Sequence, residues 1–497
     1  MRIISFALAL ALLGAPGDGR ENAHTITERA LAAMGVARDA RQVRSLRAEV
    51  KLVNAHLMDS DHPEPPHLLD FGEGTVSDDF VLGASLTEMR TTTATGSVVE
   101  ASALNVGELV QSVVVYDGRP QPPHGLAAAP NWDLSNPIRA LKAALAAPDL
   151  QLEDVASVRG VSVHVVSFVR GEVRVRLFLS DETNLPIVVE SEMALRGDIA
   201  WRPRGDLIDR TEFSNWNLVS GLRYPFQWDM SRNGVPLRTT MITALQVDPP
   251  LDPAKFSPSE AARAELDFPG RRDTDDLPLG RPDRPIAEIS PGVVQIPGGW
   301  YVTLVRQSDG VVVIDAPISN GYSAKVIAEA SRRFPGLPIK AVITTTSFGW
   351  HFAGLREYAA RGIPIYLLDR NGALVRNVLT APHRLDPDSL ARHGVTFKLH
   401  LVAGRTVIGE GDNQLVVYPI RRGTGQMLMT YIPSTRMLHT AEMVQPLGPA
   451  GEMLFPESLL EIDQAVRDAG ISVETIIGMH MSPTPWRRVS EAVRRES

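Results

Sequence analysis

The stretch Val342–Leu355 places several chemically capable side chains where a strand ends. The β-branched run Ala341–Thr345 predicts a buried strand, and Ala353–Leu355 opens a helix. Between them lie side chains that can donate, accept or stack: Ser347, Phe348, Trp350, His351 and Phe352. The mouth of an α/β sheet, where strands end, is where such folds place their sites. We therefore expect a functional site at this strand end.

Ser347 and His351 are four residues apart, a spacing that allows a hydroxyl and an imidazole to touch. A serine nucleophile needs such a base beside it. However, the sequence around Ser347 lacks the strand-turn-helix pattern of a nucleophile elbow. A serine-centred mechanism is therefore a minor alternative.

A second group of possible metal ligands lies early in the chain: His56, Asp59, Asp61, His62 and His67. Imidazoles and carboxylates both bind metals. Three prolines in the same segment predict an extended, exposed loop without fixed geometry. We interpret this segment as a solvated loop rather than a metal site.

The composition is that of a soluble protein with more than one domain. The chain of 497 residues can form two or three domains, and its 44% hydrophobic and 22% charged residues are ordinary values. The net charge of -8 and the absence of a basic run argue against a nucleic-acid partner. The expected partner is a small-molecule substrate or ligand.

Met1–Gly17 reads as a bacterial signal peptide, and the alternative is a buried N-terminal helix. Arg2 supplies a positive start, Ile3–Leu13 a short apolar run, and Ala15-Pro16-Gly17 small residues for cleavage. The apolar run is too short to span a bilayer. The chain contains 0 cysteines, which excludes disulfides and a lipidated cysteine. We expect a periplasmic or secreted protein with no integral membrane segment once the signal is removed.

Residues 18–265 are expected to form an N-terminal helix followed by an antiparallel β-rich domain. The helix covers Asn22–Met34, with Thr25 and Thr27 as candidate caps. Val161–Val169 and Glu172–Leu179 form one predicted hairpin, and Asn233-Gly234 is the strongest turn signal of another. Four prolines and many charges predict an exposed linker over residues 266–285.

The later part of this β-rich region resembles the curved sheets of periplasmic lipoprotein-carrier-like domains. The resemblance lies in a Glu-Thr-Asn-Leu-Pro turn, an Asn-Trp…Gly-Leu-Arg-Tyr-Pro segment and a closing Asp-Pro-Pro-Leu-Asp-Pro-Ala-Lys-Phe. It implies a concave face for something apolar. The alternative is a sheet that its own side chains fill.

Residues 286–497 alternate predicted strands and helices, which favours an α/β arrangement. Several landmarks follow one another in a recognisable order. Val-Val-Val-Ile-Asp-Ala-Pro is followed by the strand before His351, a Gly-Leu-x-x-Tyr helix, a Tyr-Ile-Pro hairpin, Thr-Ala-Glu and Gly-Met-His. This order resembles the metallo-β-lactamase fold. It implies a two-domain α+β protein whose C-terminal domain is an αββα sandwich of that type.

The resemblance also implies which metal ligands the chain has lost. The family's first two signature histidines fall on Thr346 and Phe348, and its signature aspartate falls on Trp350. A later histidine falls on Arg422. One of the family's two zinc sites is therefore gone.

The second zinc site is partly kept. The last signature histidine is His351, the final histidine is His480, and the bridging aspartate is replaced by Glu442. Two imidazoles and a carboxylate can hold one divalent metal, zinc or similar, with water in the open positions. Such a site would suit hydrolysis of an ester, lactone or amide-type bond.

Arg422 separates two interpretations of this site. Beside a divalent ion its charge is strongly repulsive, so a bound metal requires Arg422 to point away. In a metal-free pocket Arg422 pairs with Glu442, and His351, Glu442 and His480 act as acid and base. That pocket, lined by Thr346, Phe348, Trp350 and Phe352, would suit isomerisation, elimination or cyclisation of an apolar substrate. The number of lost ligands favours the metal-free pocket.

A third interpretation is a non-catalytic protein that binds a small molecule. It follows if His351 and His480 only pack and hydrogen-bond. Of the other histidines, His439 is expected in a strand near the pocket, and His383 and His393 on the surface. None of these three is assigned a chemical role.

Overall fold

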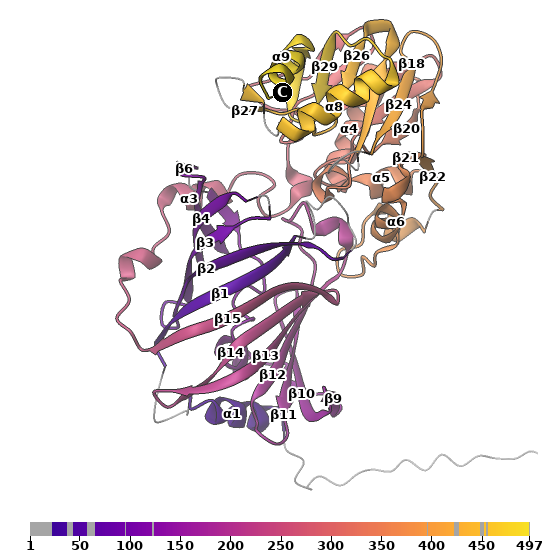
Figure 1. The fold of residues 1–497 in the computed structure, drawn as a ribbon. Helices are drawn as coiled ribbons and strands as arrows, with labels where there is room; N and C mark the ends of the chain where they lie inside the picture. The colour runs from indigo at the N-terminus through magenta and orange to yellow at the C-terminus, as the bar shows by residue number, and fades with distance from the viewer. Residues whose placement is uncertain are drawn as a thin grey trace, which may run out of the picture.

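The computed structural model describes residues 22–36, 43–56, 65–94, 96–121, 124–394, 396–421, 427–447, 452–453 and 456–496. Within them the chain forms two strand-rich parts, one built on a large sheet and one on two smaller sheets (Figure 1). The expected signal peptide, Arg422 and most of the early histidine-rich loop lie outside the described residues.

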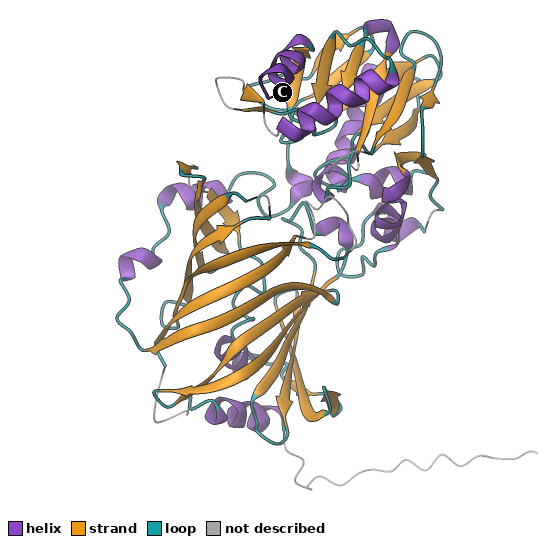
Figure 2. Ribbon diagram, viewed as in Figure 1, coloured by secondary structure: helices purple, strands orange, loops and turns teal. Residues whose placement is uncertain are grey.

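The first part is a single antiparallel sheet that curves strongly (Figure 2). Its strands follow the order β6-β5-β4-β3-β2-β1-β15-β14-β13-β12-β11-β10-β8, with β7 beside β5 and β9 beside β10. The strands are β1 Ser45–His56, β2 Leu68–Asp79, β3 Ala84–Thr92, β4 Val98–Val106, β5 Leu109–Tyr116, β6 Arg119–Pro120, β7 His124–Ala127, β8 Gln151–Leu152, β9 Ala156–Val158, β10 Val161–Arg170, β11 Val173–Ser180, β12 Pro186–Met193, β13 Leu207–Val219, β14 Leu222–Arg232 and β15 Val235–Val247.

Both predicted hairpins are confirmed. Arg170 pairs with Val173 at the end of β10 and β11. Asn233 and Gly234 both have positive φ, 49° and 79°, and join β14 to β15. Two central residues with positive φ match the right-handed twist of the strands they connect.

Two helices fill much of one face of this sheet. In α1 (Ala23–Ala33) and α2 (Pro137–Ala146), Ile26 and Leu141 are buried in the same core as strand residues such as Phe168 and Phe213. The predicted cap of α1 is wrong, because the side chain of Asn22 accepts from Thr25 N. Asn is as good a cap as Thr, and here it stands one residue before the first helical position.

The connection between the two parts is less exposed than its composition predicts. It contains α3 (Glu260–Leu266) and the short 3₁₀ turns Pro253–Phe256 and Thr274–Asp276. Thr274 is only 1% exposed, and the carboxylate of Asp275 accepts from Gly321 N at 2.7 Å. The polar groups of this segment therefore bond to the neighbouring parts instead of to water.

The second part consists of two main sheets and a small hairpin. The seven-stranded sheet has the order β16-β17-β18-β19-β20-β21-β22, and the six-stranded sheet β23-β24-β25-β26-β29-β30. Their strands are β16 Ala287–Ser290, β17 Val293–Ile296, β18 Val302–Gln307, β19 Gly310–Ile314, β20 Ile339–Ile343, β21 Ile365–Leu368, β22 Leu399–Val402, β23 Thr406–Ile408, β24 Leu415–Ile420, β25 Met427–Ile432, β26 Met437–His439, β29 Thr475–Gly478 and β30 Met481–Pro485, with β27 Pro446–Leu447 paired to β28 Glu452–Met453.

The two main sheets share one core, and helices pack outside it. Val312 and Ile343 of one sheet are buried in the same cluster as Leu428 and Ile477 of the other. The outer face of the seven-stranded sheet packs against α4 (Asn320–Arg333), α5 (Leu355–Ala360), α6 (Gly372–Thr380) and α7 (Ser389–His393). The other sheet packs against α8 (Pro456–Ala469) and α9 (Arg487–Glu496), as Figure 1 shows. The alternation seen in the sequence thus corresponds to sheets covered by helices.

Polar contacts join the two parts. Asp206 N donates to Pro382 O at 2.7 Å, and the Asp206 carboxylate accepts from Leu385 N at 3.0 Å. Arg202 reaches Asp386 at 3.4 Å. Among the described residues, every helix is too short or too polar to cross a membrane.

Candidate functional site

Three strand ends bring the retained metal-ligand residues together. His351 closes a 3₁₀ turn, Gly349–His351, that follows β20. Glu442 and His480 follow β26 and β29, which are parallel neighbours in the other sheet. Leu428 N donates to Thr345 O at 2.8 Å and ties the two sheets at this edge. The site therefore lies at the edge of the two sheets where β20, β26 and β29 end.

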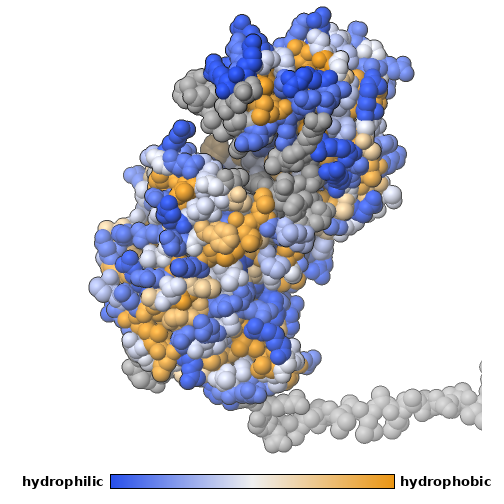
Figure 3. Space-filling model, in the orientation of Figure 1, coloured by the Kyte–Doolittle hydropathy of each residue, from blue (hydrophilic) through white to orange (hydrophobic). Residues whose placement is uncertain are grey.

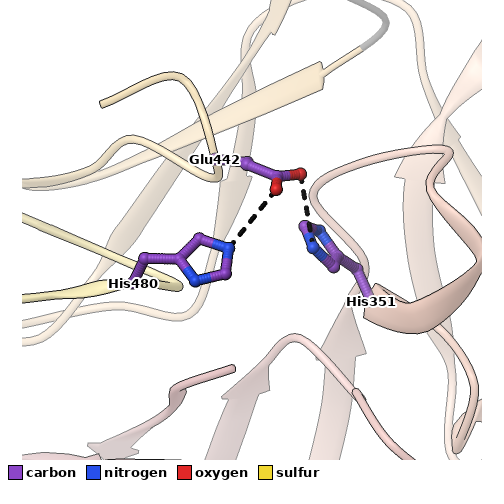
Figure 4. Close-up of side chains that lie close together, drawn as sticks. All are labelled: His351, Glu442 and His480. Atoms are coloured by element: carbon purple, nitrogen blue, oxygen red, sulfur yellow. Dashed lines mark hydrogen bonds and ion pairs between the residues drawn. The ribbon is translucent and has the colours of Figure 1, made fainter. Parts of the chain in front are cut away.

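The three side chains converge on one carboxylate (Figure 4). His351 Nε2 lies 3.2 Å from Glu442 Oε2, and His480 Nε2 lies 3.3 Å from Glu442 Oε1. One ligand atom from each residue can be chosen so that all lie within 4.8 Å of one another. The convergence expected for His351, Glu442 and His480 is present in the fold.

Backbone and side-chain contacts hold Glu442 in place. Ala441 has a positive φ of 53°, and its carbonyl accepts from Met479 N at 3.1 Å. Gln445 Nε2 donates to Glu442 Oε1 at 3.2 Å. Gln445 was not among the predicted site residues. Its position three residues after Glu442 is its only sequence signal.

Burial keeps His351 neutral at ordinary pH. The side chain is 0% exposed, and burial lowers its pKa to about 4, with Glu442 opposing the shift and His480 adding to it. Neither ring nitrogen of His351 makes a hydrogen bond. For Glu442, burial works against the charged form, yet the charge that His351 carries when protonated and the hydrogen bonds of His480 and Gln445 lower its pKa. A neutral imidazole facing a carboxylate is the protonation state that binds metal.

A second layer of titratable groups lies beneath the cluster. Burial raises the pKa of Asp315 to about 7, although Thr345 N and Thr345 Oγ1 each donate to its carboxylate at 2.8 Å. His439 Nε2 lies 3.9 Å from Asp315 Oδ2, and burial lowers the His439 pKa to about 3. His439 is thus a strand histidine close to the site, as expected.

Aromatic rings surround the imidazoles. Trp300 and Trp350 stack with centroids 6.4 Å apart, and the Trp300 centroid is 6.3 Å from that of His351 and 6.4 Å from that of His480. Phe348 lies 6.0 Å from His351. Trp300 was not among the predicted site residues; it follows Gly298-Gly299 and comes shortly before β18. That position resembles many ordinary strand starts.

Other predicted pocket residues have structural positions. Thr346 is 0% exposed, and its Oγ1 accepts from Phe348 N at 2.8 Å, which shapes the loop before His351. Phe352 is also 0% exposed and packs in the helix-facing core, so its expected place in the pocket lining is corrected. The structure gives no hydrogen bond between Ser347 and His351. Arg422, the residue that separates the two interpretations, lies outside the described ranges.

The prediction that His383 lies on the surface is wrong. The residue is 7% exposed, and burial is the main cause that lowers its pKa. Its Nδ1 lies 3.9 Å from Asp388 Oδ2, beside the ion pair of Asp388 with Arg356. A histidine between a proline and an arginine gives no sequence signal of such burial. His393 is exposed, as expected.

Comparisons with known proteins find similarity only among solved structures. No protein-family model and no curated protein matches the chain. The chain is similar to a metallo-β-lactamase from Pontibacter korlensis, with 15% identity over 44% of this chain and 98% of that chain and a TM-score of 0.33. It is also similar to TMB-1, with 17% identity over 44% of this chain and 97% of that chain and a TM-score of 0.31. A metallo-β-lactamase from Hirschia baltica is similar as well, with 14% identity over 44% of this chain and 97% of that chain and a TM-score of 0.33. The identities are too low to transfer an activity to this chain.

Proposed function

We propose that this protein is a hydrolase that cleaves an ester, lactone or amide-type bond in a small, mostly apolar substrate. In this proposal His351, Glu442 and His480 hold one divalent cation, zinc or similar. The observation that carries it is the convergence of two imidazole nitrogens and one carboxylate within 4.8 Å. We also propose that the second part is an αββα sandwich of the metallo-β-lactamase type, because its two sheets share a core and have helices outside.

The donors fit such an ion. His351 is fully buried, yet its Nε2 has no hydrogen-bond partner while it faces Glu442. A buried polar atom without a partner is costly unless something else occupies its lone pair. A zinc-class ion held there would supply a Lewis acid and would lower the pKa of water to about 7. The chain's own groups orient that centre, while Trp300 and Trp350 offer an apolar surface to the substrate.

A metal-free enzyme is the second candidate, and two observations favour it. His480 Nε2 is already hydrogen-bonded to Glu442 Oε1 at 3.3 Å. In addition, His351 Nδ1 has no hydrogen-bond partner, whereas metal-binding histidines almost always donate their second nitrogen to one. In this candidate Glu442 accepts a substrate proton and His480 returns it, which suits isomerisation, elimination or cyclisation.

The two candidates and simple ligand binding can be separated by activity measurements on the full chain. Purified protein would be assayed on p-nitrophenyl acetate, p-nitrophenyl butyrate and γ-butyrolactone with and without chelator. We expect chelator to abolish hydrolysis, zinc to restore it, and His480→Ala to lower kcat/KM by at least about 100-fold. His393→Ala is the matched control, because His393 is exposed and remote from the cluster in the fold.

The outcomes are distinct. Activity that survives chelator but is lost in His480→Ala supports the metal-free candidate. Hydrolysis that survives both treatments contradicts the assignment of this site. No turnover of any ester, lactone or isomerisable analogue, with ligand binding intact in His480→Ala, supports a non-catalytic binding protein.

We further propose that the protein is exported from a bacterial cell, on the basis of the first seventeen residues. Expression in a bacterial host, followed by mass measurement of the periplasmic fraction, tests this. A product that starts at or close to residue 18 supports export, and a full-length product in the cytoplasm contradicts it.

A further inference from the structure

A cavity of about 1010 Å³ lies between the two parts of the molecule. One wall consists of residues in connections between strands of the large sheet: Gly83 after β2, Glu108 before β5, Gly171 after β10 and the segment 194–200 after β12. Trp300 and Trp350 of the second part form the facing wall. A cavity of this size holds a drug-sized molecule, and domain interfaces are common places for such sites.

The charged groups that line the cavity are already satisfied. Four arginines and four acidic residues line it, so the lining has no net charge. Arg170 pairs with Asp133 at 2.6 Å, Arg196 with Glu172 at 3.1 Å, and Arg272 with Glu108 at 2.5 Å. The fourth arginine, Arg271, pairs with Glu265, and Asp198 accepts from two backbone N–H groups. Because the lining has no net charge, it offers a charged ligand no net attraction to offset the cost of removing that charge from water.

The remaining lining is mostly apolar and includes two rings that also lie beside the imidazole cluster. Leu126, Ala128 and Ile199 lie on the side of the large sheet. On the other side, Trp300 and Trp350 line the cavity, and each ring has its centroid 6.3 Å from that of His351. The tryptophan pair therefore belongs to both the cavity and the candidate site. On the outer face shown in Figure 3, apolar and hydrophilic residues are mixed over the large sheet, so exposed apolar surface alone does not single out a site.

We propose that this cavity binds the uncharged, apolar portion of the substrate, an aromatic or aliphatic group, and thereby makes the first part of the chain a specificity element. The position of the reacting bond beside His351 rests on the proposed function. Binding of an apolar group in the cavity does not, because it needs no turnover. The balanced charges offer ionic groups no net attraction, and the two indole rings provide the stacking surface.

The test uses the full chain and the uncharged fluorophore N-phenyl-1-naphthylamine. We expect saturable binding with one site in the cavity. Leu126→Asp adds a charge to the lining, and we expect it to raise Kd by about tenfold or more because the carboxylate would be desolvated beside the probe. Leu218→Asp is the matched control: Leu218 is 69% exposed, is not part of the lining, and undergoes the same substitution.

His480→Ala separates the cavity from the proposed function. We expect it to leave the Kd of the fluorophore within about twofold while it removes hydrolysis. If circular dichroism shows that Leu126→Asp does not fold, Ala128→Asp replaces it, because Ala128 also lines the cavity and lies on a loop. Failure of the fluorophore to bind, or equal affinities for Leu126→Asp and Leu218→Asp, overturns the proposal. Loss of hydrolysis alone does not.

Discussion

At the scale of single residues, the site depends on a turn that packs tightly against the start of α4. Gly354 follows the 3₁₀ turn that carries His351, and its N–H donates to Ala316 O at 2.8 Å. A Cβ atom at this position would lie 2.0 Å from Ser323 Oγ and 2.5 Å from Ser319 O, at the start of α4. Only glycine allows the turn to approach the helix this closely.

We therefore expect Gly354→Ala to destabilise the protein by about 1–3 kcal/mol, the usual cost of overpacking. The turn must also shift, so His351 should lose alignment with Glu442 and catalysis should fall. Urea denaturation and the ester assay measure the two effects.

Gly404→Ala is the control for this prediction, because a Cβ atom there meets no atom within 4 Å. Equal unfolding midpoints for the two variants would show that the turn has more room than the structure indicates.

The sequence predicted the residues of the cluster but only part of their surroundings. His351, Glu442 and His480 were found because a known order of landmarks placed them at strand ends. Trp300 and Gln445 were missed, since neither stands at a position that the landmark order marks. Which residues line a pocket depends on side-chain direction, and for this reason Phe352 was placed in the pocket although it packs in the core.

At the scale of elements, a buried arginine joins three helices beside the site. Arg356 of α5 is 2% exposed and pairs with Asp388 through Nε at 2.5 Å and Nη2 at 3.0 Å. Its Nη1 donates at 2.9 Å to the carbonyls of Val378 and Leu379 in α6. Asp388 also caps α7 by accepting from Ala391 N at 2.8 Å.

Arg356→Ala should destabilise the protein by about 3–5 kcal/mol, because Asp388 and two carbonyl groups would remain buried without their partner. Chemical denaturation followed by circular dichroism measures this change. Arg90→Ala is the control, because Arg90 and its partner Glu100 are both exposed, 56% and 61%. We expect a change within about 0.5 kcal/mol. A loss of similar size in both variants would rule out a special role for the buried pair.

Elements with strong local signals were predicted well. The hairpin at Asn233-Gly234 was found because its turn requires residues that tolerate positive φ, and the strand over 310–314 because it is continuously apolar. The linker over 266–285 was predicted to be fully exposed, but part of it is buried. Its charged residues form ion pairs with distant residues such as Arg202, and local composition does not reveal such pairs.

At the scale of the whole molecule, the two parts are held together by a buried carboxylate. The side chain of Asp206 is 2% exposed, and it accepts from Arg384 Nε at 2.9 Å and from the N–H groups of Arg384 and Leu385. Burial opposes its charged form, but these donors outweigh burial and lower the pKa of Asp206. The contact therefore depends on a deprotonated carboxylate.

The pH dependence of this contact follows from the direction of the shift. A carboxyl group whose folded pKa is below the unfolded value of about 3.9 stabilises the fold above that pH. This stabilisation is lost as the pH falls through the folded pKa. Asp206→Asn should therefore cost about 1–3 kcal/mol at pH 7 and progressively less below about pH 4.

Calorimetry of wild type and Asp206→Asn at pH 7, 4 and 3 measures this dependence. Asp154→Asn, at an exposed position of the first part, is the control. A difference between wild type and Asp206→Asn that stays constant over this range would contradict the account of the contact. The relative placement of the two parts, and with it the cavity, could not be predicted from sequence, because it depends on these few pairs between distant residues.

The most direct test of the central claim is zinc binding to the full chain, measured by isothermal titration calorimetry. The claim is that His351, Glu442 and His480 form a site for one divalent cation. We predict one ion per chain for wild type and for Glu410→Gln, a control at an exposed position. Glu442→Gln, which keeps the shape but removes the anionic ligand, should weaken binding by at least about 100-fold. No saturable binding to wild type, or equal affinity in Glu442→Gln, would contradict the claim.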